Sequence, residues 1–126
     1  GPGFGGSCFP KDTMALVRLA EEKGYDFKIV KSAIEVNLRQ PLLQVQKIRE
    51  ALGGLEGKRI GVLGLAFKPN TDDIREAPSI RIVQELQREG AMVKTFDPAA
   101  MENARSVLDG VEMPMRQCPD AMPWSS

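Results

Sequence analysis

The segment from residue 60 to residue 96 constrains the fold most, because its apolar pattern changes from strand to helix and back. Residues 60–67 and residues 91–96 are short, mostly apolar runs of strand length. Between them, residues 77–89 place apolar side chains at helical spacing, with Pro78 in the first turn. Strand, helix and strand joined by short loops form a βαβ unit, which requires a parallel sheet. This pattern predicts the α/β class.

The preceding half of the chain is predicted to be helical. Residues 1–7 contain four glycines and are expected to form a loop, because glycine loses too much backbone entropy in a helix or strand. A helix is predicted over residues 10–23 and a long one over residues 28–52, each followed by glycine. Pro41 falls inside the long pattern and predicts a kink or a break, which leaves one helix or two open.

A change in composition near residues 53–57 divides the chain into two expected units, 1–56 and 57–126. In the second unit, residues 101–108 are predicted to be helical and residues 111–113 to form a short strand. Nothing is assigned beyond them.

Composition excludes several classes of function. The 17 basic and 17 acidic residues cancel, so no field of one sign attracts nucleic acid or an anionic membrane. The chain has no histidine and no closely spaced cysteines, so neither a zinc site nor a serine–histidine pair can form within it. No apolar run reaches the ~20 residues that span a bilayer, and no signal peptide is recognisable, so we expect a cytoplasmic protein.

Cys8 is the candidate nucleophile. The thiolate is the reactive form of cysteine, and the unpaired N–H groups and positive dipole end of the predicted helix favour it. Lys11 adds positive charge one turn on, and Asp12 can orient a water or exchange a proton with a substrate oxygen. The other interpretation is that Cys8 is a small buried residue in a glycine turn, with Lys11 and Asp12 on a solvated helix face.

A second candidate site is the loop over residues 67–76, which carries Lys68 and Arg75. Ligands bind at the carboxyl ends of strands in open α/β sheets; lysine suits a diphosphate, and arginine suits a second anion or a nucleotide edge. Alternatively, the loop is solvated and its acidic residues neutralise both cations. The nearby Gly61-Val-Leu-Gly64 lacks the Gly-x-Gly-x-x-Gly fingerprint for NAD, so this unit is expected to bind another ligand or to bind through side chains.

Together these two segments resemble the UDP-glucose/GDP-mannose dehydrogenase family. Residues 3–12, Gly-Phe-Gly-Gly-Ser-Cys-Phe-Pro-Lys-Asp, are similar to the nucleophile segment of that family. Residues 64–75, Gly-Leu-Ala-Phe-Lys-Pro-Asn-Thr-Asp-Asp-Ile-Arg, are similar to the opening of its nucleotide-sugar-binding domain. The resemblance covers roughly residues 1–110. It implies a helical central dimerisation segment followed by a partial Rossmann-like parallel βαβ domain.

The resemblance also implies an activity and a set of roles. The family oxidises the C6 alcohol of a nucleotide sugar to a carboxylate with two NAD⁺, and the resemblance implies UDP-glucose as the first candidate substrate. The reaction passes through a thiohemiacetal and then a thioester on cysteine. Cys8 would be the nucleophile, Asp12 would help water to attack the thioester, and Lys11 and Arg75 would contact NAD. The substrate-binding residues would be Phe4, Gly5, Gly6, Phe67 and Lys68. The long helix would form the core of a homodimer.

Two alternatives stay open. The same thiolate chemistry serves GDP-mannose and UDP-N-acetylhexosamine dehydrogenases, and a non-catalytic dimerisation or nucleotide-binding module could keep this scaffold. Cys8, flanked by glycines and a charged first turn, argues against the second. The NAD-binding domain of the family, with a lysine and an asparagine that assist catalysis, precedes the matching segment. We therefore expect the chain not to turn over substrate by itself.

Overall fold

Proline and glycine set the limits of the two N-terminal helices. The computed structural model describes residues 1–114. Helix α1 (Phe9–Glu22) has Pro10 in its first turn, where a missing N–H costs no hydrogen bond. Helix α2 (Lys28–Leu52) ends at Gly53, whose φ of 67° is the left-handed conformation that glycine adopts without strain. Both predicted helices are confirmed within one residue at each end.

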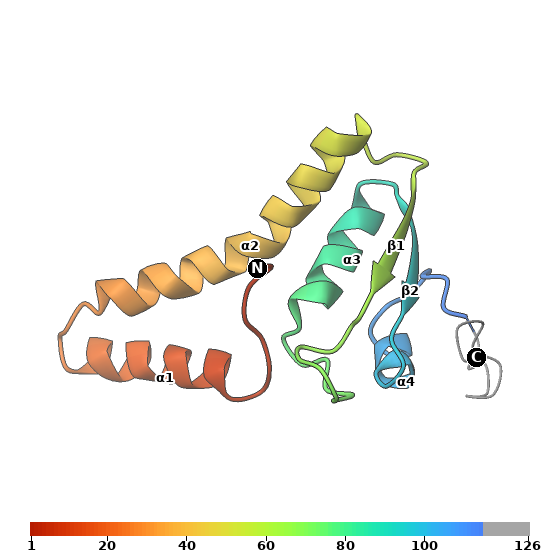
Figure 1. Cartoon of the computed structure of the whole chain (residues 1–126). Coiled ribbons are helices and arrows are strands. Elements are labelled where there is room, and N and C mark those ends of the chain that lie inside the picture. The colour runs from red at the N-terminus through yellow and green to blue at the C-terminus, as the bar shows by residue number, and fades with distance from the viewer. Residues whose placement is uncertain (115–126) are drawn as a thin grey trace.

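Helix α2 continues through Pro41, which settles the question of one helix or two. Figure 1 shows the axis of α2 changing direction near its middle, as a proline inside a helix predicts. Pro41 and Val45 are the buried residues of this helix. Burial on this face holds the second half of α2 against α3.

The βαβ unit is formed as predicted. Strand β1 (Arg59–Leu63), helix α3 (Pro78–Arg88) and strand β2 (Met92–Phe96) follow one another, and the strands pair in parallel with Arg59 opposite Met92 and Leu63 opposite Phe96. Helix α4 (Met101–Arg105) follows.

Three elements are shorter than predicted. Strand β1 stops at Leu63 because Gly64 turns the chain with φ of 88°, so the strand predicted over residues 60–67 loses its second half. Helix α4 stops at Arg105, and its predicted last turn is replaced by a tight turn. The predicted strand near residue 112 is reduced to one parallel bridge between Lys94 and Glu112.

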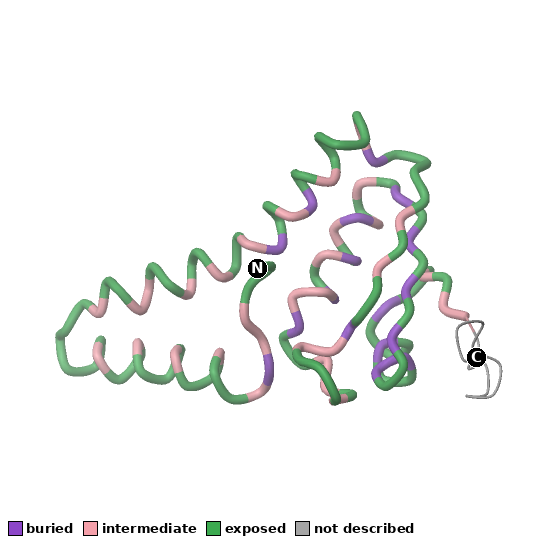
Figure 2. The backbone as a smooth tube through the Cα atoms, in the orientation of Figure 1, coloured by how far each residue is buried: buried purple, intermediate pink, exposed green. Residues whose placement is uncertain are grey.

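The core lies in the βαβ unit, in α4 and in the adjoining half of α2 (Figure 2). Val83 and Leu86 of α3 are fully buried, as the helical spacing predicts, and Val45 of α2 joins the same cluster. Each such side chain contributes about 1.5–3 kcal/mol on burial. Helix α1, by contrast, has no buried residue. Within residues 1–114, no helix combines the length and the apolar character that crossing a bilayer requires.

Candidate active site

Cys8 occupies the N-terminus of α1, as the sequence predicts. It is the N-cap residue of the helix, and its carbonyl oxygen accepts a hydrogen bond of 2.8 Å from the Asp12 N–H. Its side chain is exposed, and the Ser7 hydroxyl oxygen lies 3.6 Å from the sulfur. The thiol therefore stands open to solvent at the positive end of a helix. This exposure argues against the interpretation of Cys8 as a buried packing residue.

Lys11 and Asp12 lie exposed in the first turn of α1. Neither side chain makes a hydrogen bond or ion pair with another described residue. Both are therefore available to a ligand, and both lie within one turn of the thiol.

The loop that carries Cys8 packs against the loop between β1 and α3. We call residues 1–8 the cysteine loop and residues 64–77 the β1–α3 loop. The Gly6 N–H donates a hydrogen bond of 2.9 Å to the carbonyl oxygen of Arg75. The two candidate segments, which two helices separate in the sequence, thus lie against each other.

Two glycines make this contact possible. A Cβ atom at Gly5 would lie 2.1 Å from the carbonyl oxygen of Glu76, and a Cβ at Gly6 would lie 2.9 Å from the Phe67 ring. Gly6 also has φ of 95°, which side chains disfavour. On the other side of the contact, Glu76 adopts φ of 51°, an uncommon conformation for a residue with a side chain. Both loops are therefore shaped for close approach.

The aromatic residues of the site face different neighbours. The Phe4 ring meets the Phe9 ring edge to face, with centroids 4.7 Å apart. Phe67 packs against Gly6, and the ammonium group of Lys68 lies 5.2 Å from the centre of the Phe67 ring. Of the predicted substrate-binding residues, Gly5, Gly6, Phe67 and Lys68 therefore gather where the two loops meet.

Arg75 pairs with Asp73 inside the β1–α3 loop. Its Nε donates to Asp73 Oδ1 at 2.9 Å and its Nη2 to Oδ2 at 2.6 Å. These hydrogen bonds lower the pKa of Asp73 from 3.8 to about 2. The same pairing raises the pKa of Arg75. The pairing expected of a solvated loop is thus present.

Asp97 is a structural residue that the sequence did not single out. Its carboxylate accepts four backbone hydrogen bonds: from Leu65 and Ala66 at the start of the β1–α3 loop, and from Ala99 and Ala100 before α4. Burial by itself raises the pKa of Asp97, but the four hydrogen bonds more than offset it, so the pKa lies below its usual value. An aspartate directly after a strand and before a proline was the available signal.

Asn37 of α2 was also missed. Its side-chain amide accepts a hydrogen bond of 2.7 Å from the Phe4 N–H and donates one of 3.0 Å to the Phe4 carbonyl oxygen. The only sign in the sequence was an amide beside the apolar positions Ile34 and Leu38. Its partner, 33 residues away, could not be inferred.

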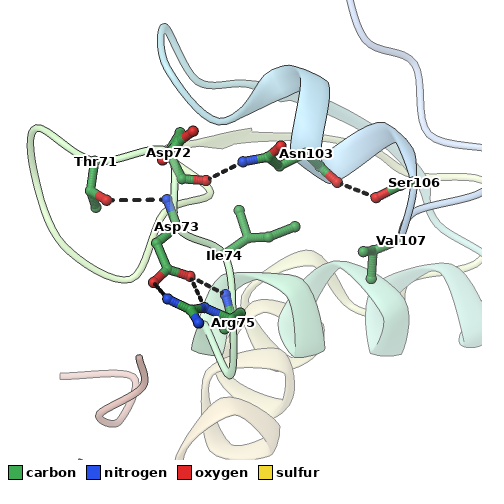
Figure 3. A pocket seen from close by; sticks show the side chains of 8 residues that line it. All are labelled: Thr71, Asp72, Asp73, Ile74, Arg75, Asn103, Ser106 and Val107. Carbon is green, nitrogen blue, oxygen red and sulfur yellow. Dashed lines mark hydrogen bonds and ion pairs between the residues drawn. The ribbon is translucent and has the colours of Figure 1, made fainter. Parts of the chain in front are cut away.

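A cavity of about 520 Å³ opens beside the β1–α3 loop, on the side of α4 (Figure 3). Asn103 of α4 donates to the Asp72 carbonyl oxygen across it at 2.9 Å. Among the predicted site residues only Arg75 lines this cavity, and Figure 3 shows its guanidinium turned onto Asp73. The residues around Cys8 are not part of it.

The chain matches known proteins over most of its length. Two models of the UDP-glucose/GDP-mannose dehydrogenase family match the chain, the central domain over residues 1–39 and the UDP-binding domain over residues 61–121. UDP-glucose 6-dehydrogenase TuaD of Bacillus subtilis is 50% identical over 108 residues, which are 86% of this chain and 23% of that protein. The chain spans about a quarter of the length of the curated relatives it matches.

Solved structures give the same result. The UDP-glucose dehydrogenase of the archaeon Pyrobaculum islandicum superposes with a TM-score of 0.88 at 50% identity, over 92% of this chain and 27% of that one. The GDP-mannose dehydrogenase of Pseudomonas aeruginosa superposes with a TM-score of 0.67 at 36% identity, over 82% of this chain and 22% of that one. The α/β fold with its Rossmann-like unit is thereby confirmed. With both motifs, their order and their fold in common, this chain belongs to the UDP-glucose/GDP-mannose dehydrogenase family.

Proposed function

We propose that this chain supplies the nucleophile and part of the nucleotide-sugar site of an NAD-dependent UDP-glucose 6-dehydrogenase. The observation that carries the proposal is the hydrogen bond between Gly6 and Arg75, because it joins an exposed thiol at a helix N-terminus to a cationic loop after a parallel strand. Relatives at about 50% identity carry the name UDP-glucose 6-dehydrogenase. The similarity to the GDP-mannose enzyme is lower, which favours UDP-glucose among the sugars.

In the proposed reaction, the C6 alcohol of UDP-glucose first loses a hydride and a proton to become an aldehyde. The Cys8 thiolate adds to the aldehyde carbon and forms the anion of a thiohemiacetal, which loses a second hydride to give a neutral thioester. Water, oriented by Asp12, then breaks the carbon–sulfur bond and leaves a carboxylate and the free thiol. NAD⁺ supplies the hydride acceptor for both oxidations.

The residues proposed to contact NAD fit an anionic cofactor. Lys11 is exposed, and the Arg75 side chain is 68% exposed. The pairing with Asp73 occupies the Nε and Nη2 atoms of Arg75, which leaves other N–H donors of the guanidinium for a phosphate. On the substrate side, we propose that Lys68 pairs with the diphosphate and that Phe67, with Phe4, Gly5 and Gly6, shapes the sugar pocket.

We further propose a homodimer formed through α2. Ile29, Val36 and Leu43 lie seven residues apart on this helix and are 80%, 52% and 40% exposed. A stripe of that period is typical of helix pairing. We also propose that the chain divides into the units 1–56 and 57–126; the family matches, which end at residue 39 and begin again at residue 61, support this boundary. Location in the cytoplasm stays a prediction.

The test of the proposed function is substrate oxidation by the complete polypeptide that contains these residues. With UDP-glucose and NAD⁺, Cys8→Ser should lower steady-state acid formation by about three orders of magnitude or more, because no thioester can form. Ser106→Ala is the control, because this exposed serine donates its hydroxyl to the Asn103 carbonyl oxygen and not to the cysteine loop, and it should retain most of the activity. GDP-mannose and UDP-N-acetylmannosamine serve as competing substrates. An unchanged rate in Cys8→Ser would refute the nucleophile role.

A further inference from the structure

The cysteine loop is held to α2 by one side chain. Asn37 pairs with both the N–H and the carbonyl oxygen of Phe4, at 2.7 and 3.0 Å, in the way that one strand pairs with another. The contact joins residues 33 positions apart, and both partners are half-buried. The Asn37 side chain thereby uses its oxygen and one of its two N–H groups on the Phe4 backbone.

The loop is shaped to receive this side chain. A Cβ at Gly3 would lie 2.8 Å from Asn37 Oδ1, and Gly3 has φ of 117°, a conformation that favours glycine. The backbone at Gly3 therefore lies so close to the Asn37 amide that only a residue without a side chain fits there.

Few other interactions fix the loop within the described residues. Residues 1–5 belong to no helix or strand. Beyond Asn37, the backbone of the loop before Cys8 is tied by the hydrogen bond from Gly6 to Arg75, and the Phe4 ring rests on Phe9. The two hydrogen bonds between Asn37 and Phe4, which we call the clamp, lie two residues from the hydrogen bond between Gly6 and Arg75. Fixing Phe4 therefore limits the positions that Gly6 can take.

We propose that Asn37 is a positioning residue for the nucleophile segment. By fixing the Phe4 peptide, it sets where Gly5 and Gly6 meet the β1–α3 loop and so where the thiol stands relative to the nucleotide-sugar loop. It touches no reacting atom. The kinetic part of this inference rests on the proposed function, whereas the clamp itself is a property of the chain.

Amide hydrogen exchange of the 126-residue chain tests the clamp without any substrate. In Asn37→Ala, the Phe4 and Gly6 amides should both exchange roughly tenfold faster or more. The Phe4 amide loses its acceptor on Asn37, and the Gly6 amide loses the fixed backbone that holds it to the Arg75 carbonyl oxygen. The Val83 amide in the core should be unchanged. Gln46→Ala, which removes an exposed amide from the same helix, is the control and should leave Phe4 and Gly6 unchanged. Unchanged Gly6 exchange in Asn37→Ala overturns the proposal.

Kinetics of the complete polypeptide separate positioning from folding. Asn37→Ala should lower kcat/KM for UDP-glucose roughly tenfold to a hundredfold while the melting temperature stays near that of Gln46→Ala. Asn37→Asp keeps an acceptor for the Phe4 N–H but places a carboxylate oxygen against the Phe4 carbonyl oxygen, so it too should lower kcat/KM and speed exchange at Gly6. If Asn37→Ala does not fold, the same two measurements on Asn37→Asp decide: parent-like exchange at Gly6 together with parent-like kcat/KM overturns the proposal. Activity that survives Cys8→Ser would instead sink the proposed function and leave the exchange result standing.

Discussion

Gly5 shows at the scale of one residue how the site depends on close packing. A methyl group there would meet the Glu76 carbonyl oxygen at 2.1 Å, and a backbone atom cannot turn aside as a flexible side chain can. Gly5→Ala should therefore force the two loops apart and break the hydrogen bond from Gly6 to Arg75. We expect faster exchange of the Gly6 amide and a KM for UDP-glucose raised about tenfold or more.

The matched control for this change is Gly61→Ala. Gly61 has nothing within 4 Å of its Cβ position and lies in β1, where alanine costs little. Gly61→Ala should leave Gly6 exchange and KM unchanged. Parent-like values in Gly5→Ala would show that the contact between the loops does not shape the site.

Asp97 makes a second prediction at this scale, concerning stability and pH. Asp97→Asn keeps the shape of the side chain but points an N–H₂ group at backbone donors, so we expect a loss of about 2–3 kcal/mol in the free energy of unfolding. Because the folded pKa of Asp97 lies below its usual 3.8, the stabilisation is complete above that value and is lost as the pH falls through the folded pKa.

Urea unfolding of the parent protein and Asp97→Asn checks both parts. The difference in unfolding free energy should stay constant from pH 7 down to about pH 5 and shrink below about pH 4. The control, Asp109→Asn, changes an exposed aspartate and should unfold like the parent protein. A difference between parent and Asp97→Asn that is equally large at low pH would contradict the charge-based account.

At the scale of elements, the sequence predicted what depends on local pattern and missed what depends on distant partners. The limits of α1, α2 and α3 follow from periodicity, proline and glycine, and the structure confirms them within one residue. Strand β1 was predicted too long because residues 64–67 are apolar. In the structure Asp97 accepts hydrogen bonds from the Leu65 and Ala66 amides. The sequence marks Asp97 as a turn residue but does not show these distant partners.

Helix α2 carries the prediction about assembly. If Ile29, Val36 and Leu43 form the dimer stripe, Val36→Glu places a charge in an apolar seam and should weaken the dimer at least about tenfold. Gln84→Glu adds the same charge to an exposed position of α3, outside this helix, and should not. Sedimentation equilibrium measures both. A parent-like dimer in Val36→Glu would move the interface elsewhere.

At the scale of the whole molecule, the proposed site lies where the cysteine loop and the β1–α3 loop meet. Sequence motifs identified both loops and assigned each a chemistry, since a thiol before a helix and cations after a strand are local features. The sequence did not show that Gly6 bonds to Arg75 or that Asn37 holds Phe4. Those contacts bring together residues separated by α2, and only the fold determines them.

The central claim is that Cys8 carries the substrate as a thioester. Mass spectrometry of the complete polypeptide tests it, with Asp12→Asn used to slow hydrolysis so that the intermediate accumulates with UDP-glucose and NAD⁺. The account predicts a UDP-glucuronyl adduct on the peptide that contains Cys8, and none in the double variant that also carries Cys8→Ser. Acid formation without any adduct on Cys8, together with full activity in Cys8→Ser, would contradict it.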